Sequence, residues 1–150
     1  KRQVLQVKNE LPQGDLKRGA AIYEKAQCGK CHRRQGKGEA MGPDLTSAPH
    51  RFDERLLLET LLFPSQSIAD DYGAMSVVTR DGRAFTGVVN AAAGKVTLLQ
   101  ANGEKVTLDR KEIEQMLPSR KSAMPDGILD AFDANQIVDL VAFLLDRDER

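Results

Sequence analysis

The sequence predicts a mainly α fold in a single domain, interrupted at about residues 75–117 by an antiparallel β meander or small barrel. Helical spacing of apolar residues near both ends of the chain predicts the helices, and turn dipeptides between β-branched segments predict the insertion. The length of 150 residues is usual for one domain with its own core. We therefore expect residues 1–13 to lead into a helical core formed by residues 14–74 and 118–150.

The first predicted helix covers residues 15–26. Leu16, Ala20 and Tyr23 recur at the spacing of one helical face. Gly19 lies in the same stretch, although a glycine destabilises a helix interior by about 1 kcal/mol relative to alanine. A glycine at this position therefore predicts the close approach of another backbone.

Two further helices are expected, at residues 52–63 and 133–145. Asp53 is placed to cap the first, and a proline follows its last residue. Asp133 is placed to cap the second, with a glutamine three residues later as in a capping box. The segment 33–49 is rich in Gly, Pro and Ser and is expected to be a loop.

The insertion is predicted from short β-branched segments with turn dipeptides between them. The segments are residues 75–80, 84–90, 95–100 and 105–109. Asp81-Gly82 and Asn102-Gly103 separate two pairs of them, and such dipeptides are the strongest short signals for a hairpin. We expect four or five antiparallel strands, closed by residues 112–118.

Charge and hydropathy exclude several classes of partner. The 22 basic residues balance the 22 acidic ones, so no global field favours nucleic acid or an anionic membrane. The longest apolar stretch, residues 56–63, is far shorter than the roughly 20 residues that span a bilayer. The chain begins at Lys1 without a signal peptide, so we expect a mature or excised form, with fusion to an upstream domain left open.

Both cysteines fall in one motif, Cys28-Gly29-Lys30-Cys31-His32, for which three interpretations compete. A thioredoxin-like dithiol requires a buried strand before the first cysteine, whereas a helix is expected here. A zinc site requires four ligands. The chain offers only His50 in addition to the three motif residues, and two of those, Cys31 and His32, are adjacent in sequence. The pattern C-x-x-C-H favours the third interpretation, which is covalent attachment of one haem.

The spacing of this motif suits haem chemistry. The thiols of Cys28 and Cys31 can add across the two vinyl groups of the haem, and the two-residue gap sets their separation. His32 then lies under the iron and binds it as a neutral imidazole. We therefore predict one haem c attached at the two cysteines, with His32 as an axial ligand.

The residues around the motif resemble a class I cytochrome c. Residues 14–23 look like the first helix of that fold, residues 42–45 look like the loop after the haem motif, and Met124-Pro125 looks like the loop before the terminal helix. The resemblance implies that the Pro43 carbonyl accepts the proton of the ligand histidine and that Met124 is the second axial ligand. The haem pocket that it implies includes Pro43, Leu45, Tyr72 and Pro125.

The chain is also similar to the haem-binding domain widespread in Planctomycetes and Verrucomicrobia, often found at the C-terminus of larger secreted dehydrogenase-like proteins. The similarity runs from about residue 14 to residue 145. His32 and Met124 lie much further apart in sequence than in ordinary class I cytochromes, and removal of residues 75–117 restores an ordinary spacing. The resemblance thus implies a class I helical fold around one haem, with the β segment inserted before the methionine loop.

Other residues compete with Met124 for the second axial position. Met41 is close in sequence to the haem motif and is expected on the same side of the haem, while Met75 and Met116 flank the β insertion and are expected to pack it. We favour Met124 because the following proline fixes its loop just before a helix. His50 is the rival ligand, and an open sixth position is the remaining alternative.

Three functions follow from a haem of this kind. Ligation of the iron by protein on both sides prevents oxygen and peroxide from binding, which favours an electron carrier that is not an enzyme, passing electrons from a dehydrogenase-type donor to a respiratory acceptor. A haem enzyme or gas sensor with a weak sixth ligand is the alternative, and a binding module that uses the β insertion is the third. The resemblance also implies export, to the periplasm or beyond the cell.

Basic residues surround the haem motif and precede the methionine loop. They predict a docking surface for an acidic redox partner close to the haem edge. The residues are Lys25, Lys30, Arg33, Arg34, Lys37, Arg120 and Lys121.

Overall fold

A computed structural model describes residues 13–65, 73–122 and 124–147 of the chain. The chain divides into two compact units. We call residues 1–64 with 126–150 the helical unit and residues 65–125 the β unit, and we describe each by itself.

The prediction of a mainly α fold is wrong. About 34% of the chain is helical and about 30% is strand, and the strands of the β unit form a five-stranded antiparallel sheet. Strand therefore makes up nearly as much of the chain as helix, and β7 (Ile113–Ser122) continues past the predicted end of the insertion. α5 (Ala134–Leu144), the longest helix in the described part of the chain, has 11 residues.

Side-chain caps start the three main helices. α2 (Leu16–Lys25) begins after Asp15 and α4 (Glu54–Leu62) begins after Asp53, and each of these carboxylates accepts a hydrogen bond from a backbone N–H of the first turn. α5 begins after Asp133, which forms a capping box with the glutamine three residues later through hydrogen bonds of 2.8 and 2.9 Å. The three predicted helices are confirmed, with boundaries within two residues of the expected ones.

The segment predicted as a loop between the haem motif and α4 contains several short elements. They are β1 (Arg33–Arg34), β2 (Lys37–Gly38), η3 (Leu45–Ser47) and α3 (Ala48–Arg51). Each is too short to show a hydrophobic period, and contacts within the segment hold them in place. The N–H of Gln35, for example, donates to Oγ1 of Thr46 at 2.7 Å.

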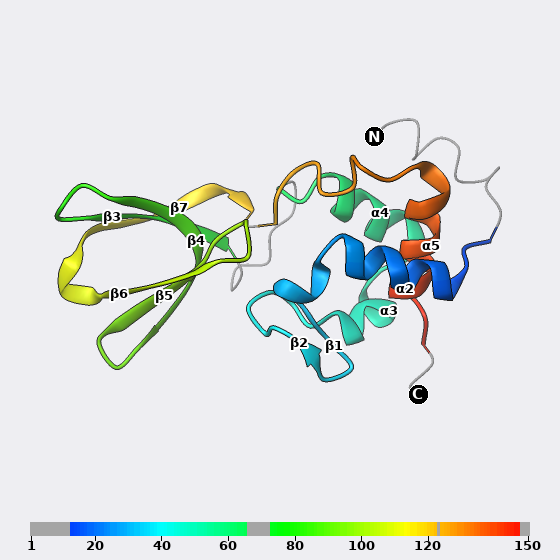
Figure 1. Ribbon diagram of the computed structural model, residues 1–150, viewed down its shortest axis with the longest axis horizontal. Coiled ribbons are helices and arrows are strands. Elements are labelled where there is room, and N and C mark those ends of the chain that lie inside the picture. Colours follow the sequence, from blue (N-terminus) through cyan, green and yellow to red (C-terminus); the bar gives the residue numbers. More distant parts are fainter. Residues whose placement is uncertain (1–12, 66–72, 123, 148–150) are drawn as a thin grey trace. The chain divides into compact units, whose positions relative to one another are not determined.

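α2 packs across α5 in backbone-to-backbone contact (Figure 1). A Cβ on Gly19 would collide with the carbonyl oxygen of Asp139 and would lie 2.6 Å from the Cβ of Phe143. A Cβ on Gly14 would lie 2.6 Å from the carbonyl oxygen of Val138. The close approach predicted for Gly19 is therefore confirmed, and the missing side chains allow the two helices to touch.

The carboxylate of Asp139 connects the two helices at this crossing. Asp139 is only 5% exposed, and its two oxygens accept hydrogen bonds from the N–H of Asp15 at 2.7 Å and from Nε of Arg18 at 2.8 Å. The bond from Arg18 lowers the pKa of Asp139 and outweighs the opposing effect of burial. Asp139 therefore stays ionised inside the interface.

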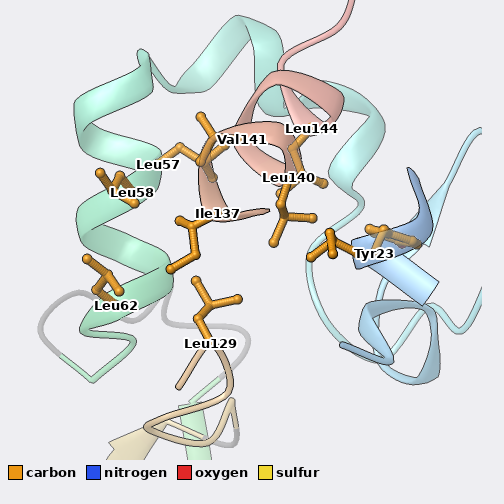
Figure 2. Close-up of a cluster of buried hydrophobic side chains, with 10 residues drawn as sticks. Tyr23, Leu57, Leu58, Leu62, Leu129, Ile137, Leu140, Val141 and Leu144 are labelled. Carbon is orange, nitrogen blue, oxygen red and sulfur yellow. The ribbon is translucent and has the colours of Figure 1, made fainter. Parts of the chain in front are cut away.

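The apolar core of the helical unit lies around α5. Figure 2 shows Ile137 and Val141 directed toward the buried leucines of α4 and Leu140 directed toward Tyr23 of α2. The rings of Tyr23 and Phe143 are 5.5 Å apart between centroids. α5 thus contributes apolar side chains to both of its neighbours, α2 and α4.

The β unit is an antiparallel sheet with strand order β6-β5-β4-β3-β7 (Figure 1). Its first four strands are β3 (Gly73–Thr79), β4 (Ala84–Ala92), β5 (Lys95–Leu99) and β6 (Lys105–Asp109). These strands follow one another as a meander, and β7 then returns beside β3. The sheet therefore has two edge strands, β6 and β7.

β4 changes partner at Gly87. Residues up to Gly87 pair with β3, and residues from Val88 onward pair with β5. A Cβ on Gly87 would collide with the carbonyl oxygen of Leu99, so a glycine permits this close passage of the two strands. Val77, Val96, Leu98 and Leu108 form the buried apolar cluster of the unit.

We predict that Asp139→Asn lowers the free energy of unfolding by about 1–3 kcal/mol at neutral pH, because buried and charged hydrogen bonds are lost. The folded pKa of Asp139 is lowered, so its ionised form stabilises the fold above the usual carboxyl pKa, and this contribution disappears as the pH falls through the folded pKa. Urea unfolding at several pH values should show the difference between parent and variant shrinking progressively below about pH 5.

Asp126→Asn is the matched control, since Asp126 is exposed in a turn. A loss that is the same at every pH, or one that the Asp126 variant reproduces, would contradict this role of Asp139.

Candidate functional site

The two cysteines and the histidine of the motif lie in one tight turn directly after α2. Gln27 adopts a left-handed conformation with φ of 61° and ends the helix, and η2 (Cys28–Lys30) follows. The carbonyl oxygen of Cys28 accepts hydrogen bonds from the N–H groups of Cys31 at 3.2 Å and of His32 at 3.0 Å. The three side chains are all half-buried and belong to the helical unit.

The imidazole of His32 is held by the loop that follows the hairpin β1–β2. Its Nδ1 lies 2.7 Å from the carbonyl oxygen of Pro43. Because a carbonyl only accepts, Nδ1 is the donor, and in the neutral ring Nε2 then has a free lone pair. An imidazole fixed in this tautomer is the form that binds a metal ion.

Gly42 provides the space in which the His32 ring lies. A Cβ on Gly42 would lie 2.8 Å from Cε1 and 2.9 Å from Nδ1 of His32. The N–H of Gly42 also donates to the carbonyl oxygen of Cys31 at 2.7 Å, which closes the loop onto the motif. Gly42 opens the segment 42–45 that resembles the loop after the haem motif, but the local sequence does not indicate this role.

Burial affects the titration of all three groups of the motif. It raises the pKa of the Cys28 thiol to about 11 and also raises the pKa of the Cys31 thiol. Burial lowers the pKa of His32, and the bond to Pro43 acts in the opposite direction. At neutral pH the site therefore contains two thiols and a neutral imidazole.

The other expected site residues are placed as follows. Leu45 is half-buried against the core of the helical unit. Met124 belongs to the β unit, where it is half-buried and donates its N–H to Oγ of Ser122 at 3.2 Å, and Pro125 is exposed. Tyr72 lies outside the described residues. The rival ligand His50 is exposed on α3.

One residue of the expected basic surface, Arg34, is bound within the helical unit. Arg34 does not extend into solvent but donates from its guanidinium to the carbonyl oxygen of Phe143 at 3.1 Å, with Cζ 4.1 Å from the centre of the Phe143 ring. The exposed basic residues near the motif are Lys25, Lys30, Arg33 and Lys37. Arg120 and Lys121 belong to β7 in the β unit.

The residues of the motif fit a covalently bound haem. Two half-buried thiols at C-x-x-C spacing can each form a thioether, and the adjacent histidine presents the correct tautomer for iron. Within residues 13–65, 73–122 and 124–147, no group of three His, Cys, Asp or Glu side chains is arranged to hold a metal ion by itself. None of the helices in this part of the chain is long and apolar enough to cross a membrane.

Comparison with known proteins gives one positive result. Residues 16–77 match the family model described as cytochrome c. The match supports a c-type cytochrome, and it implies covalently bound haem c and electron transport. It includes the haem motif and Pro43 but ends before Met124 and α5. A search of the curated proteins finds no match.

We predict that Gly42→Ala displaces the His32 ring, because the new methyl group would overlap with it. Overpacking of this kind costs about 1–3 kcal/mol. Thermal unfolding of the haem-loaded variant should show a lower midpoint, and its absorption spectrum should show altered ligation of the iron.

Gly29→Ala is a matched control within the motif, since its Cβ would have only an ordinary contact of 3.9 Å with Tyr23. If the two variants behave alike, Gly42 has no special role in seating the histidine.

Proposed function

We propose that this chain is an electron-transfer protein that carries one haem c on Cys28 and Cys31, with His32 and Met124 as the axial ligands. The observation that carries the proposal is the hydrogen bond of 2.7 Å between Nδ1 of His32 and the carbonyl of Pro43, directly after the C-x-x-C pair. When bound, the haem would supply a one-electron iron couple. The protein residues would hold it, orient it and exclude water from one face.

The proposed role of His32 is to bind the iron through Nε2 in a fixed orientation. The loop of Gly42 and Pro43 would keep the ring from turning. The backbone of Gly42 lies close against the ring, and the carbonyl oxygen of Pro43 accepts the hydrogen bond from Nδ1. A ligand that does not move on oxidation or reduction keeps the reorganisation of the site small, which is what a carrier of single electrons requires.

Met124 is proposed as the second ligand on the strength of the Met-Pro loop before α5. A thioether is soft and neutral, so it favours the ferrous state relative to a second histidine. Both axial positions would then belong to the protein, and small oxidants would have to displace a ligand before they could react.

The type of cytochrome and its partners are proposed from the wider sequence pattern. The strands β3 to β7 are proposed to be an insertion between α4 and the methionine loop, as in the secreted haem-binding domain that the chain resembles. We propose an exported location, a dehydrogenase-type donor and a respiratory acceptor. Lys25, Lys30, Arg33 and Lys37 would guide an acidic partner toward the haem edge.

Met124→Ala should remove the absorption band of a methionine–iron bond from the oxidised protein and should lower its reduction potential, because the soft ligand is lost. Optical titration against redox mediators measures both quantities. His50→Ala is the control and should leave them unchanged. If the Met124 variant keeps the parent spectrum, a different residue binds the iron.

Lys30→Glu should slow association with an acidic redox protein by about tenfold at low salt, without a comparable change in potential. The rate should fall steeply through about 0.1 M salt, where the screening length is roughly 10 Å. Stopped-flow electron transfer measures the rate, and Lys111→Glu in the β unit serves as the control for charge. A rate that responds to neither salt nor Lys30 would show that basic residues do not guide docking.

A further inference from the structure

The hydroxyl of Tyr23 is buried and has no hydrogen-bond partner. Tyr23 is 8% exposed, and among the side chains that the structure describes its oxygen is the one buried nitrogen or oxygen without a partner. Buried tyrosine hydroxyls are normally hydrogen-bonded, because an unpaired polar group in a low-dielectric interior is costly. The unpaired hydroxyl therefore requires an explanation.

Tyr23 lies against the haem-attachment segment. A Cβ on Gly29 would lie 3.9 Å from Cε1 of Tyr23, so the ring lies next to the motif. On another side the ring contacts Phe143 of α5 at an interplanar angle of 60°, and this contact restricts its rotation. Cys28 packs against the same apolar cluster.

The hydroxyl keeps its proton throughout the physiological range. Burial raises the pKa of Tyr23 to about 12, and the nearby Cys28 adds to the increase. Tyr23 can therefore act as a donor beside the motif.

We propose that Tyr23 is a positioning residue for the haem, and that its hydroxyl donates a hydrogen bond to the thioether sulfur formed by Cys28. The inference rests on the proposed function, because this thioether exists only once the haem is attached. When the thiol adds across a vinyl group, a sulfur–carbon bond forms and the thiol hydrogen passes to the neighbouring vinyl carbon, with no net oxidation. The sulfur then has no proton and can only accept.

Such a bond would have two consequences for the haem. It would fix the Cys28 side of the haem relative to α2, since the Tyr23 ring is already held by Phe143. It would also withdraw electron density from the sulfur and hence from the haem, which raises the reduction potential. Both effects depend on the sulfur of Cys28 and not on that of Cys31.

The two cysteines allow a matched test with haem-loaded protein. Tyr23→Phe removes only the hydroxyl, and it is compared in the parent, in Cys31→Ala, which attaches haem through Cys28, and in Cys28→Ala, which attaches it through Cys31. We expect a lower reduction potential and a lower unfolding midpoint in the first two backgrounds. In the third we expect an unchanged potential and a midpoint that does not fall, because the hydroxyl there has already lost its acceptor. An equal change in all three backgrounds, or none in the parent, would overturn the proposal.

A second measurement needs no cysteine variant. The vibrational spectrum of the tyrosine ring, taken as the difference between haem-loaded parent and Tyr23→Phe, should show a hydroxyl that donates a hydrogen bond. A free hydroxyl in that spectrum would overturn the proposal. Thr107→Val deletes a hydroxyl in the β unit and should leave the potential unaltered.

The failure of this inference differs from the failure of the proposed function. If the parent protein acquires no covalent haem, the proposed function itself is wrong. If haem attaches and the Tyr23 variant behaves identically with either cysteine, only the role of Tyr23 is wrong.

Discussion

The backbone contact between α2 and α5 determines where the haem motif lies. α2 ends immediately before Cys28, so a change in the tilt of α2 would move both cysteines. Gly19 lets the helix approach the Asp139 carbonyl, and the Asp139 carboxylate fixes the start of α2 through the N–H of Asp15. After the motif, Arg34 returns to the Phe143 carbonyl on α5. The motif is thus attached to α5 on both sides.

The site itself is formed by small residues and backbone groups rather than by a cluster of charges. His32 is held by a carbonyl oxygen, the turn is closed by the N–H of Gly42, and the thiols are protonated because they are buried. These features place two thiols and one metal ligand along a single segment. The arrangement suits a large planar group attached at several points better than a small ion coordinated from all directions.

The parts of the fold set by local sequence could be predicted, and the parts set by distant contacts could not. The caps at Asp53 and Asp133 and the haem motif are signals within a few residues, and Gly19 marked a close contact because glycine is otherwise unfavourable in a helix. The fold class was wrong because the five-stranded sheet makes the strand content nearly equal to the helical content. One pairing of that sheet joins β3 to β7, a partner distant in sequence.

Contacts between residues distant in sequence also limit the prediction of the basic surface. Arg34 was expected to be exposed, but its partner Phe143 is 109 positions away, and no local pattern links the two. The role of Gly42 was likewise invisible, since it depends on the ring of His32 across a loop.

The mass of the denatured protein tests the central claim most directly. The chain is produced with an export signal and haem-attachment machinery, unfolded in acid with organic solvent, and weighed by mass spectrometry. Covalent attachment at Cys28 and Cys31 predicts that the unfolded chain retains the mass of one haem, and that the double variant Cys28→Ala with Cys31→Ala has only the mass of the polypeptide. A parent chain that loses its haem on unfolding, or never acquires one, would contradict the claim.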